Sequence, residues 1–211
     1  LYDAGVDSLI IQDMGLLEDI SSFLQQGRAP IVKEKVQEAL DQGIAPQEIL
    51  EKGLLDGMGI IGDKFKKNEI FVPEVLIAAR AMNAGVGILK PHLVEAGVES
   101  KGTAVIGTVK GDLHDIGKNL VKMMLEGKGL SVIDLGVDVS SEQFVQAAID
   151  NNADIICCSA LLTTTMGEMK NVVAAAEEKG IRDKVKIMVG GAPITQSFCD
   201  SIGADCYEPD A

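Results

Sequence analysis

Apolar residues change their spacing near residue 100 of this 211-residue chain. Before that point they recur every three or four positions, as on one face of a helix. After it, β-branched runs alternate with helical stretches. The first part predicts four helices, which cover residues 15–25, the stretch from Pro30 to Gly43, residues 49–67 and residues 75–89. Short connections between them favour an antiparallel bundle.

The two ends of this helical part need separate interpretations. Residues 6–11 (VDSLII) have the pattern of a buried strand, which a helical bundle does not need, and residues 1–17 therefore remain unassigned. Residues 18–94 form the predicted helical domain, and the polar stretch 95–102 is interpreted as a linker. Residues 103–211 form the second domain.

The third predicted helix contains four glycines inside its span. A glycine in a helix costs about 1 kcal/mol relative to alanine, so another group must approach this helix closely. These positions are Gly53, Gly57, Gly59 and Gly62.

The second half alternates strand and helix and is assigned to the α/β class. The predicted strands cover residues 103–109, 131–135, 154–159, 185–189 and 204–207. The helices between them cover residues 116–125, 141–149, 166–178 and 195–201. This alternation predicts a doubly wound, flavodoxin-like (Rossmann-like) parallel sheet of order 2-1-3-4-5, covered on both faces. Ligands bind such sheets where strands one and three diverge at their carboxyl ends.

Composition narrows the function. The net charge of −13 disfavours a nucleic-acid partner. No apolar run approaches about 18 residues, so neither a membrane span nor a signal peptide is expected. The four cysteines form no CxxC pair, and a chain of this size does not suit an extracellular disulfide framework, so a reduced, cytoplasmic protein is expected. Cys157 and Cys158 fall in the third strand and are expected to be buried thiols, and Met58 and Met82 are expected to fill the core.

Three predicted loops meet at the carboxyl edge of the sheet, after strands one, three and four. The first holds one of only two histidines, His114, two residues after Asp112. The other, His92, is expected to be exposed at a helix end. Imidazole is a good transition-metal ligand, and its second nitrogen often donates to a carboxylate. A zinc site needs three or four protein ligands, so a metal here would take its other ligands from a prosthetic group. The alternative is a solvent-exposed histidine with no ligand.

At this point the sequence resembles the cobalamin-binding family. Residues 112–117 (DLHDIG) match its DxHxxG motif. Forty-one residues separate Gly117 from Ser159, where residues 159–161 match SxL, and Gly190-Gly191 match GG after 28 more. The helical half, notably residues 59–73, is similar to the cap module of methionine synthase and of small corrinoid proteins in methyltransferase systems. The likeness extends over about residues 18–209.

The resemblance implies a cobalamin or related cobamide bound base-off/His-on. His114 would be the lower axial cobalt ligand, Asp112 would accept its second nitrogen's proton, and the Thr165 hydroxyl would contact Asp112. Ser159 would meet the buried base, and glycines would give the nucleotide tail room. One cap helix lying over the macrocycle would explain the helical glycines. The residues implied to contact the cofactor are Phe65, Val72, Asp112, Leu113, His114, Asp115, Ile116, Gly117, Ser159, Leu161, Thr163, Thr165, Gly190 and Gly191.

The family also implies an activity. The chain has no room for a substrate barrel, so we expect a cytoplasmic subunit that carries methyl groups on cobalt in the one-carbon metabolism of an anaerobe. Its partners would be a substrate-specific methyltransferase, a second methyltransferase acting on tetrahydrofolate or a thiol, and a reductive activase. The donor would be a methylamine, methanol or a methoxy-aromatic compound. Alternatives are an adenosylcobalamin-dependent sensor, disfavoured because no Trp is present, and a mutase subunit, disfavoured by the helical cap.

Overall fold

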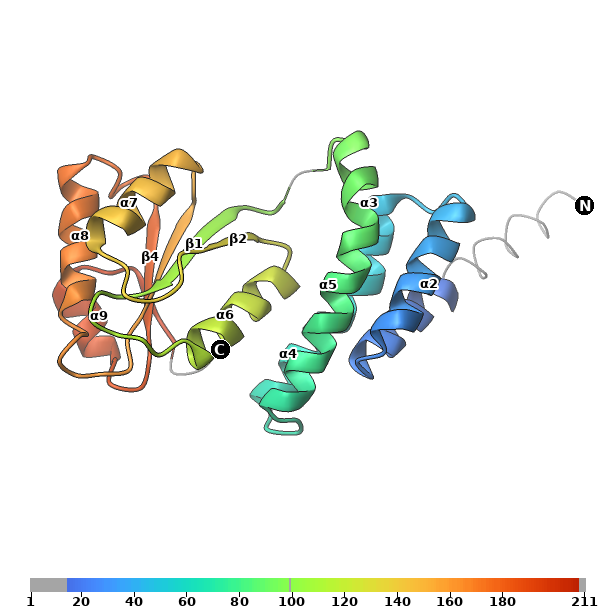
Figure 1. Ribbon diagram of the computed structural model, residues 1–211, viewed down its shortest axis with the longest axis horizontal. Coiled ribbons are helices and arrows are strands. Elements are labelled where there is room, and N and C mark those ends of the chain that lie inside the picture. Colours follow the sequence, from blue (N-terminus) through green and yellow to red (C-terminus); the bar gives the residue numbers. More distant parts are fainter. Residues whose placement is uncertain (1–14, 99, 209–211) are drawn as a thin grey trace, which may run out of the picture. The chain divides into compact units, whose positions relative to one another are not determined.

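The computed structural model describes residues 15–98 and 100–208 (Figure 1). It divides into two compact units, residues 1–99 and 100–211, each with its own core. The strand predicted over residues 6–11 lies outside the described residues. Figure 1 draws the first unit in blue to green and the second in green to red.

The first unit is helical, as the spacing of its apolar residues predicts. Residues 15–25 form a helix. It is followed by α2 (Ala29–Asp41), α3 (Pro46–Glu48), the π-helix η1 (Ile49–Leu55), α4 (Asp56–Lys66) and α5 (Val72–Glu95). Proline lies in the first turn of α2, α3 and α5, where a missing N–H costs little. The helix predicted over residues 49–67 thus corresponds to η1 and α4, and α3 precedes it without a break. The middle of this run of α3, η1 and α4 has the wider π-helical geometry.

Two of the glycines in that run allow close packing with the helix of residues 15–25. A Cβ on Gly53 would lie 3.0 Å from the Ile20 side chain, and one on Gly57 would lie 3.1 Å from the Ser21 Cα. The prediction that a macrocycle explains the helical glycines is therefore wrong for Gly53 and Gly57. The group that approaches these two glycines is the helix of residues 15–25 in the same unit.

The long helix α5 has the length and apolar composition of a membrane span. Several of its apolar residues pack inside the bundle. A Cβ on Gly85 would meet Leu54 of η1 and Val32 of α2, and Val75, Ala78 and Leu89 are buried. We therefore attribute the apolar character of α5 to its position in the core of the helical unit.

The second unit is a five-stranded sheet of order β2-β1-β3-β4-β5, in which every pair is parallel, as predicted. The strands are β1 (Thr103–Thr108), β2 (Ser131–Asp134), β3 (Ile155–Ser159), β4 (Lys186–Gly190) and β5 (Cys206–Tyr207). The helices are α6 (Ile116–Gly127), α7 (Ser141–Asp150), α8 (Glu168–Glu178) and α9 (Gln196–Ile202). The hydroxyls of Ser140 and Thr195 cap α7 and α9 by accepting backbone N–H groups.

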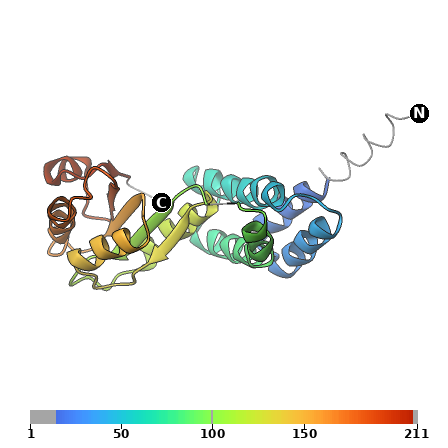
Figure 2. The same cartoon turned by 90° about the horizontal axis from the view of Figure 1, so that it is seen from above.

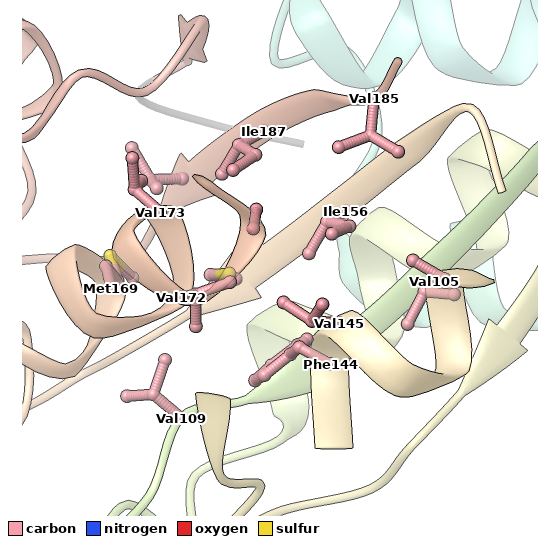
Figure 3. Packing of buried hydrophobic residues seen from close by; sticks show 14 of the residues in the cluster. Val105, Val109, Phe144, Val145, Ile156, Met169, Val172, Val173, Val185 and Ile187 are labelled. Carbon is pink, nitrogen blue, oxygen red and sulfur yellow. The ribbon is translucent and has the colours of Figure 1, made fainter. Parts of the chain in front are cut away.

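The core of this unit lies mainly on one face of the sheet. Side chains of β1, β3 and β4 pack there against those of α7, α8 and α9, among them Phe144, Ile156 and Met169 (Figure 3). A smaller cluster on the other face joins Ile106 and Cys157 to α6. Figures 1 and 2 show these helices on opposite sides of the sheet. The sheet is therefore held rigidly from both faces and presents the loops at its carboxyl edge.

The residues predicted to fill the interior are buried. Cys157 and Cys158 are each 3% exposed, and Met58 and Met82 are also buried. Burial raises the pKa of the Cys157 thiol to about 12 and also raises that of Cys158. These two cysteines are therefore neutral thiols.

Candidate functional site

The loop that follows β1 has a defined shape. Its backbone turns where the Asp112 N–H donates to the Val109 carbonyl (3.1 Å), and Gly111 has a φ of +80°, which glycine adopts readily. At the far end of the loop, the buried Thr108 hydroxyl donates to the His114 carbonyl oxygen (2.8 Å). These bonds place Asp112 and His114 at the carboxyl edge of the sheet.

The His114 side chain is oriented by Asp112. Its Nδ1 lies 2.7 Å from Asp112 Oδ1, and the His114 backbone N–H donates to the same oxygen (3.1 Å). The side chain of His114 is 51% exposed, whereas that of Asp112 is fully buried. No described residue hydrogen-bonds the other ring nitrogen, Nε2. The imidazole is thus fixed at one nitrogen and available at the other.

The second carboxylate oxygen of Asp112 is held by the loop after β3. Asp112 Oδ2 accepts the N–H groups of Leu161 (2.8 Å) and Leu162 (3.2 Å) and the hydroxyl of Thr165 (2.9 Å). Burial by itself would raise the pKa of Asp112. The hydrogen bonds from the His114 ring, from backbone N–H groups and from Thr165 outweigh that effect and hold the pKa well below its ordinary value. Asp112 is therefore an ionised, buried acceptor.

The contact between Thr165 and Asp112 was predicted, but the two backbone donors were not. The N–H groups of Leu161 and Leu162 carry no signal in the identity of their side chains, so only the folded loop reveals them. Thr165 is buried, whereas Thr163 is exposed and Ser159 is half-buried.

The loop after β4 joins the same edge of the sheet. The Ala160 N–H donates to the Gly190 carbonyl (3.2 Å), so the two loops are directly connected. Gly191 has a φ of +127°, and a Cβ there would clash with the Ala160 carbonyl oxygen. Gly191 is thus required by contact between the two loops, whereas a Cβ on Gly117 would meet nothing within 4 Å. The predicted convergence of the three loops is present.

Exposed apolar side chains flank the His114 loop and its partner loop. Leu113 (70% exposed) and Ile116 (79%) lie next to His114 in the sequence, and Leu161 (44%) and Leu162 (40%) follow β3. Leu162 was not among the predicted site residues, although its position beside the SxL motif could have indicated it. Apolar side chains this exposed, around a half-exposed imidazole, are typical of a binding surface.

The remaining predicted residues have other environments. Asp115 is exposed before α6, and its carboxylate accepts the Asn119 amide. Phe65 and Val72 are half-buried in the helical unit, near the end of α4 and at the start of α5. His92 was predicted to be exposed at a helix end. It lies in the last turn of α5, but it is half-buried instead of exposed.

The donor set determines what kind of metal could bind. Among the described residues, no group of three or more His, Cys, Asp and Glu side chains could hold a bare metal ion. A shallow depression along α2, in the helical unit, is lined by Glu34, Glu38 and Asp41, apart from the His114 loop. One free imidazole nitrogen beside an apolar surface fits a metal that arrives with most of its ligands already in place.

Comparison with known proteins identifies the metal-containing group that this site would bind. Residues 102–210 match the B12 binding domain family, and residues 16–90 match a second family described as a B12 binding domain. The chain belongs to the family of B12-binding corrinoid proteins. It is 45% identical over 197 residues to the dimethylamine corrinoid protein of Methanosarcina barkeri, covering 93% of this chain and 92% of that one.

Other corrinoid proteins are similarly related to the chain. It is 47% identical over 179 residues to trimethylamine corrinoid protein 1 of Methanosarcina acetivorans, covering 84% and 83% of the two chains. The crystal structure of the methanol:cobalamin methyltransferase complex of Methanosarcina barkeri contains a chain with a TM-score of 0.84 and 32% identity, covering 93% of this chain and 75% of that one. A solved structure similar to this chain is thus part of a methyltransferase complex.

Proposed function

We propose that this corrinoid protein carries methyl groups between two methyltransferases, with His114 as the lower axial ligand of a corrinoid bound base-off. One observation carries the proposal: the half-exposed His114 ring has Nδ1 held by Asp112 while Nε2 is free. In a member of a B12-binding family, a neutral imidazole fixed in this way is prepared to bind a metal through Nε2.

The residues on the sheet edge have distinct parts in holding the cofactor. The exposed side chains of Leu113, Ile116, Leu161 and Leu162 offer an apolar surface for the macrocycle. Gly117, where a Cβ would find open space, leaves room for the nucleotide tail. When bound, the corrinoid supplies a cobalt ion that accepts a methyl group from one partner and passes it to another.

Asp112 and Thr165 orient the His114 ring. In the neutral ring, the buried Asp112 carboxylate accepts the Nδ1 proton and so leaves the lone pair on Nε2, the nitrogen that can bind a metal. The Thr165 hydroxyl and two backbone N–H groups hold that carboxylate ionised.

The relatives support a choice of methyl donor. Because the chain is 45% identical to a dimethylamine corrinoid protein and 47% identical to a trimethylamine corrinoid protein, we place it in a methylamine demethylation system. Its partners would be a methylamine-specific methyltransferase, a second methyltransferase acting on a thiol or tetrahydrofolate, and a reductive activase. The free cysteines at 157, 158, 199 and 206 are consistent with a cytoplasmic location.

The ligand assignment is tested by spectroscopy of the corrinoid-loaded protein. In the cobalt(II) state, an axial nitrogen splits the electron paramagnetic resonance signal, and the splitting changes when histidine is labelled with ¹⁵N. We expect this change in the wild type and its complete loss in His114→Ala. His92→Ala is the matched control, because it removes the only other histidine. A wild-type signal that is insensitive to histidine labelling would refute the assignment.

The donor assignment needs a separate assay. The loaded, reduced protein is incubated with a methylamine-specific methyltransferase and mono-, di- or trimethylamine, and demethylation is followed by absorbance. We expect a change with at least one methylamine and none with methanol. A response to methanol alone would contradict the methylamine assignment and indicate a methanol demethylation system. It would not affect the assignment of His114 as the cobalt ligand.

A further inference from the structure

The segment after β2 contacts the His114 loop through an irregularity in the sheet. In the ladder between β1 and β2, Ile106 pairs with Asp134, and the next pairing is the isolated bridge between Val109 and Val139. The chain advances three residues on the β1 side but five on the β2 side. Two extra residues are therefore accommodated between Asp134 and Val139, opposite the start of the His114 loop.

The extra length is absorbed by two residues in the left-handed region. Gly136 has a φ of +83°, which costs glycine little. Asp138 has a φ of +56°, where most side chains are strained and aspartate is one of the few that are tolerated. The short polar side chain of aspartate can hydrogen-bond neighbouring backbone groups from such a position.

Asp138 holds the backbone of the His114 loop at two points. Its N–H donates to the Asp112 carbonyl oxygen (3.0 Å), and its Oδ1 accepts the Gly111 N–H (2.7 Å). One exposed residue thus binds both ends of the dipeptide from which the Asp112 side chain projects. Thr165 and the N–H groups after β3 act differently, because they bind the Asp112 carboxylate itself.

We propose that Asp138 is a positioning residue for the His114–Asp112 pair. By fixing the Gly111–Asp112 peptide, Asp138 sets the direction in which the Asp112 carboxylate enters the interior, and through it the direction of the His114 ring. The fixed ring binds a metal without first paying the entropy of ordering the loop. This inference rests on the proposed function of His114 as the axial ligand.

Three variants separate the side chain of Asp138 from its backbone. Asp138→Gly keeps the left-handed φ and the N–H bond to Asp112 but loses the acceptor for Gly111. Asp138→Asn keeps an oxygen acceptor and tolerates the same φ. Asn152→Gly is the matched control, because Asn152 also has a left-handed φ (+47°) and lies in the turn after α7.

The first measurement uses the corrinoid-loaded protein. The ratio of histidine-bound to histidine-free cobalt(II) is obtained from the ¹⁵N-histidine-sensitive resonance signal. We expect this ratio to fall about three- to tenfold in Asp138→Gly, as for the loss of one hydrogen bond of ordinary strength. Asp138→Asn should retain most of the wild-type ratio, and Asn152→Gly should retain all of it.

The second measurement uses the protein without cofactor and so does not depend on the function of His114. Amide hydrogen exchange at Gly111, followed by NMR, should be about three- to tenfold faster in Asp138→Gly than in the wild type or Asn152→Gly. Unchanged exchange would overturn the proposal whatever His114 does.

The two measurements distinguish the possible failures. A wild type without histidine-bound cobalt refutes the proposed function, while exchange at Gly111 still tests the contact with Asp138. Histidine-bound cobalt that is equally populated in wild type and Asp138→Gly overturns the positioning role alone. Equal losses in Asp138→Asn or Asn152→Gly would also overturn it, since the oxygen acceptor would then not be what matters.

Discussion

At the scale of single residues, Asp112 organises the site. Its buried carboxylate is surrounded by donors that come from its own loop and from a loop about 50 residues later. The Thr165 hydroxyl lies within reach of both Asp112 Oδ2 (2.9 Å) and the Leu162 carbonyl oxygen (3.0 Å) but has one proton. The charged acceptor makes the stronger hydrogen bond, so we assign that proton to Asp112.

This assignment predicts how Thr165 variants behave. Thr165→Val leaves a buried carboxylate short of one donor, so we expect the free energy of unfolding at pH 7 to fall by about 1–3 kcal/mol. Thr165→Ser, which keeps the hydroxyl, should lose much less. Chemical denaturation of the cofactor-free protein measures both, with the exposed neighbour in Thr164→Val as control. Equal stability of the two valine variants would show that the hydroxyl does not support Asp112.

At the scale of elements, the run of α3, η1 and α4 shows how packing shapes a helix. Its wider π-helical middle, Ile49–Leu55, holds Gly53 and leads directly to Gly57 in α4. Both glycines face the helix of residues 15–25 so closely that a side chain would press on it. The cost of placing glycine in a helix is thus offset by the contact that it permits.

Two alanine substitutions test this explanation. At Gly57 a Cβ would lie 3.1 Å from the Ser21 Cα, a backbone atom that cannot move alone, so Gly57→Ala should destabilise the helical unit by about 1–3 kcal/mol. At Gly87 of α5 a Cβ would meet nothing within 4 Å, so Gly87→Ala should stabilise it by up to about 1 kcal/mol. Thermal unfolding followed by circular dichroism compares the two. Stabilisation by both substitutions would refute the close contact.

At the scale of the whole molecule, the two units differ in the ion pairs that stabilise them. The pairs of the helical unit, Lys35–Glu38 and Lys52–Glu48, join neighbouring turns at the surface and contribute little. In the α/β unit, burial alone would raise the pKa values of Asp134 and Asp205. Bonds from Lys118 and Gly136 to Asp134, and from Ile187, Lys186 and Arg182 to Asp205, lower both pKa values instead.

These pKa shifts predict a difference in acid stability. A carboxyl whose folded pKa lies below its ordinary value of 3.8 contributes stability above about pH 4, which is lost as the pH falls through the lowered pKa. From pH 7 to pH 3, we expect the free energy of unfolding of residues 100–208 to fall by more than that of residues 15–98.

Chemical denaturation at both pH values measures this difference when NMR signals of the two units are followed separately. Asp205→Asn is the matched variant, because it removes one of the titrating groups and should reduce the extra loss. Equal acid sensitivity of both units would contradict the contribution of these aspartates.

The sequence by itself determined the architecture and the central pair of the site. Strands and helices differ in the period of their buried residues, so the switch near residue 100, the five strands and their order could be predicted. Parallel strands bring their carboxyl ends to one edge, which predicted that the loop of Asp112 and His114 lies beside the loop after the third strand. The family resemblance added the contact between Thr165 and Asp112. The family resemblance of residues 112–117, 159–161 and 190–191 then specified the chemistry expected there.

Only the tertiary structure decided how that pair is supported. The N–H groups of Leu161 and Leu162 and the two bonds of Asp138 involve the backbone, which is nearly the same for every residue type and leaves no pattern in the sequence. The reason for Gly57 likewise depends on which segments meet in the folded unit. Periodicity records which face of a segment is buried, but a contact between distant backbones exists only after the chain has folded.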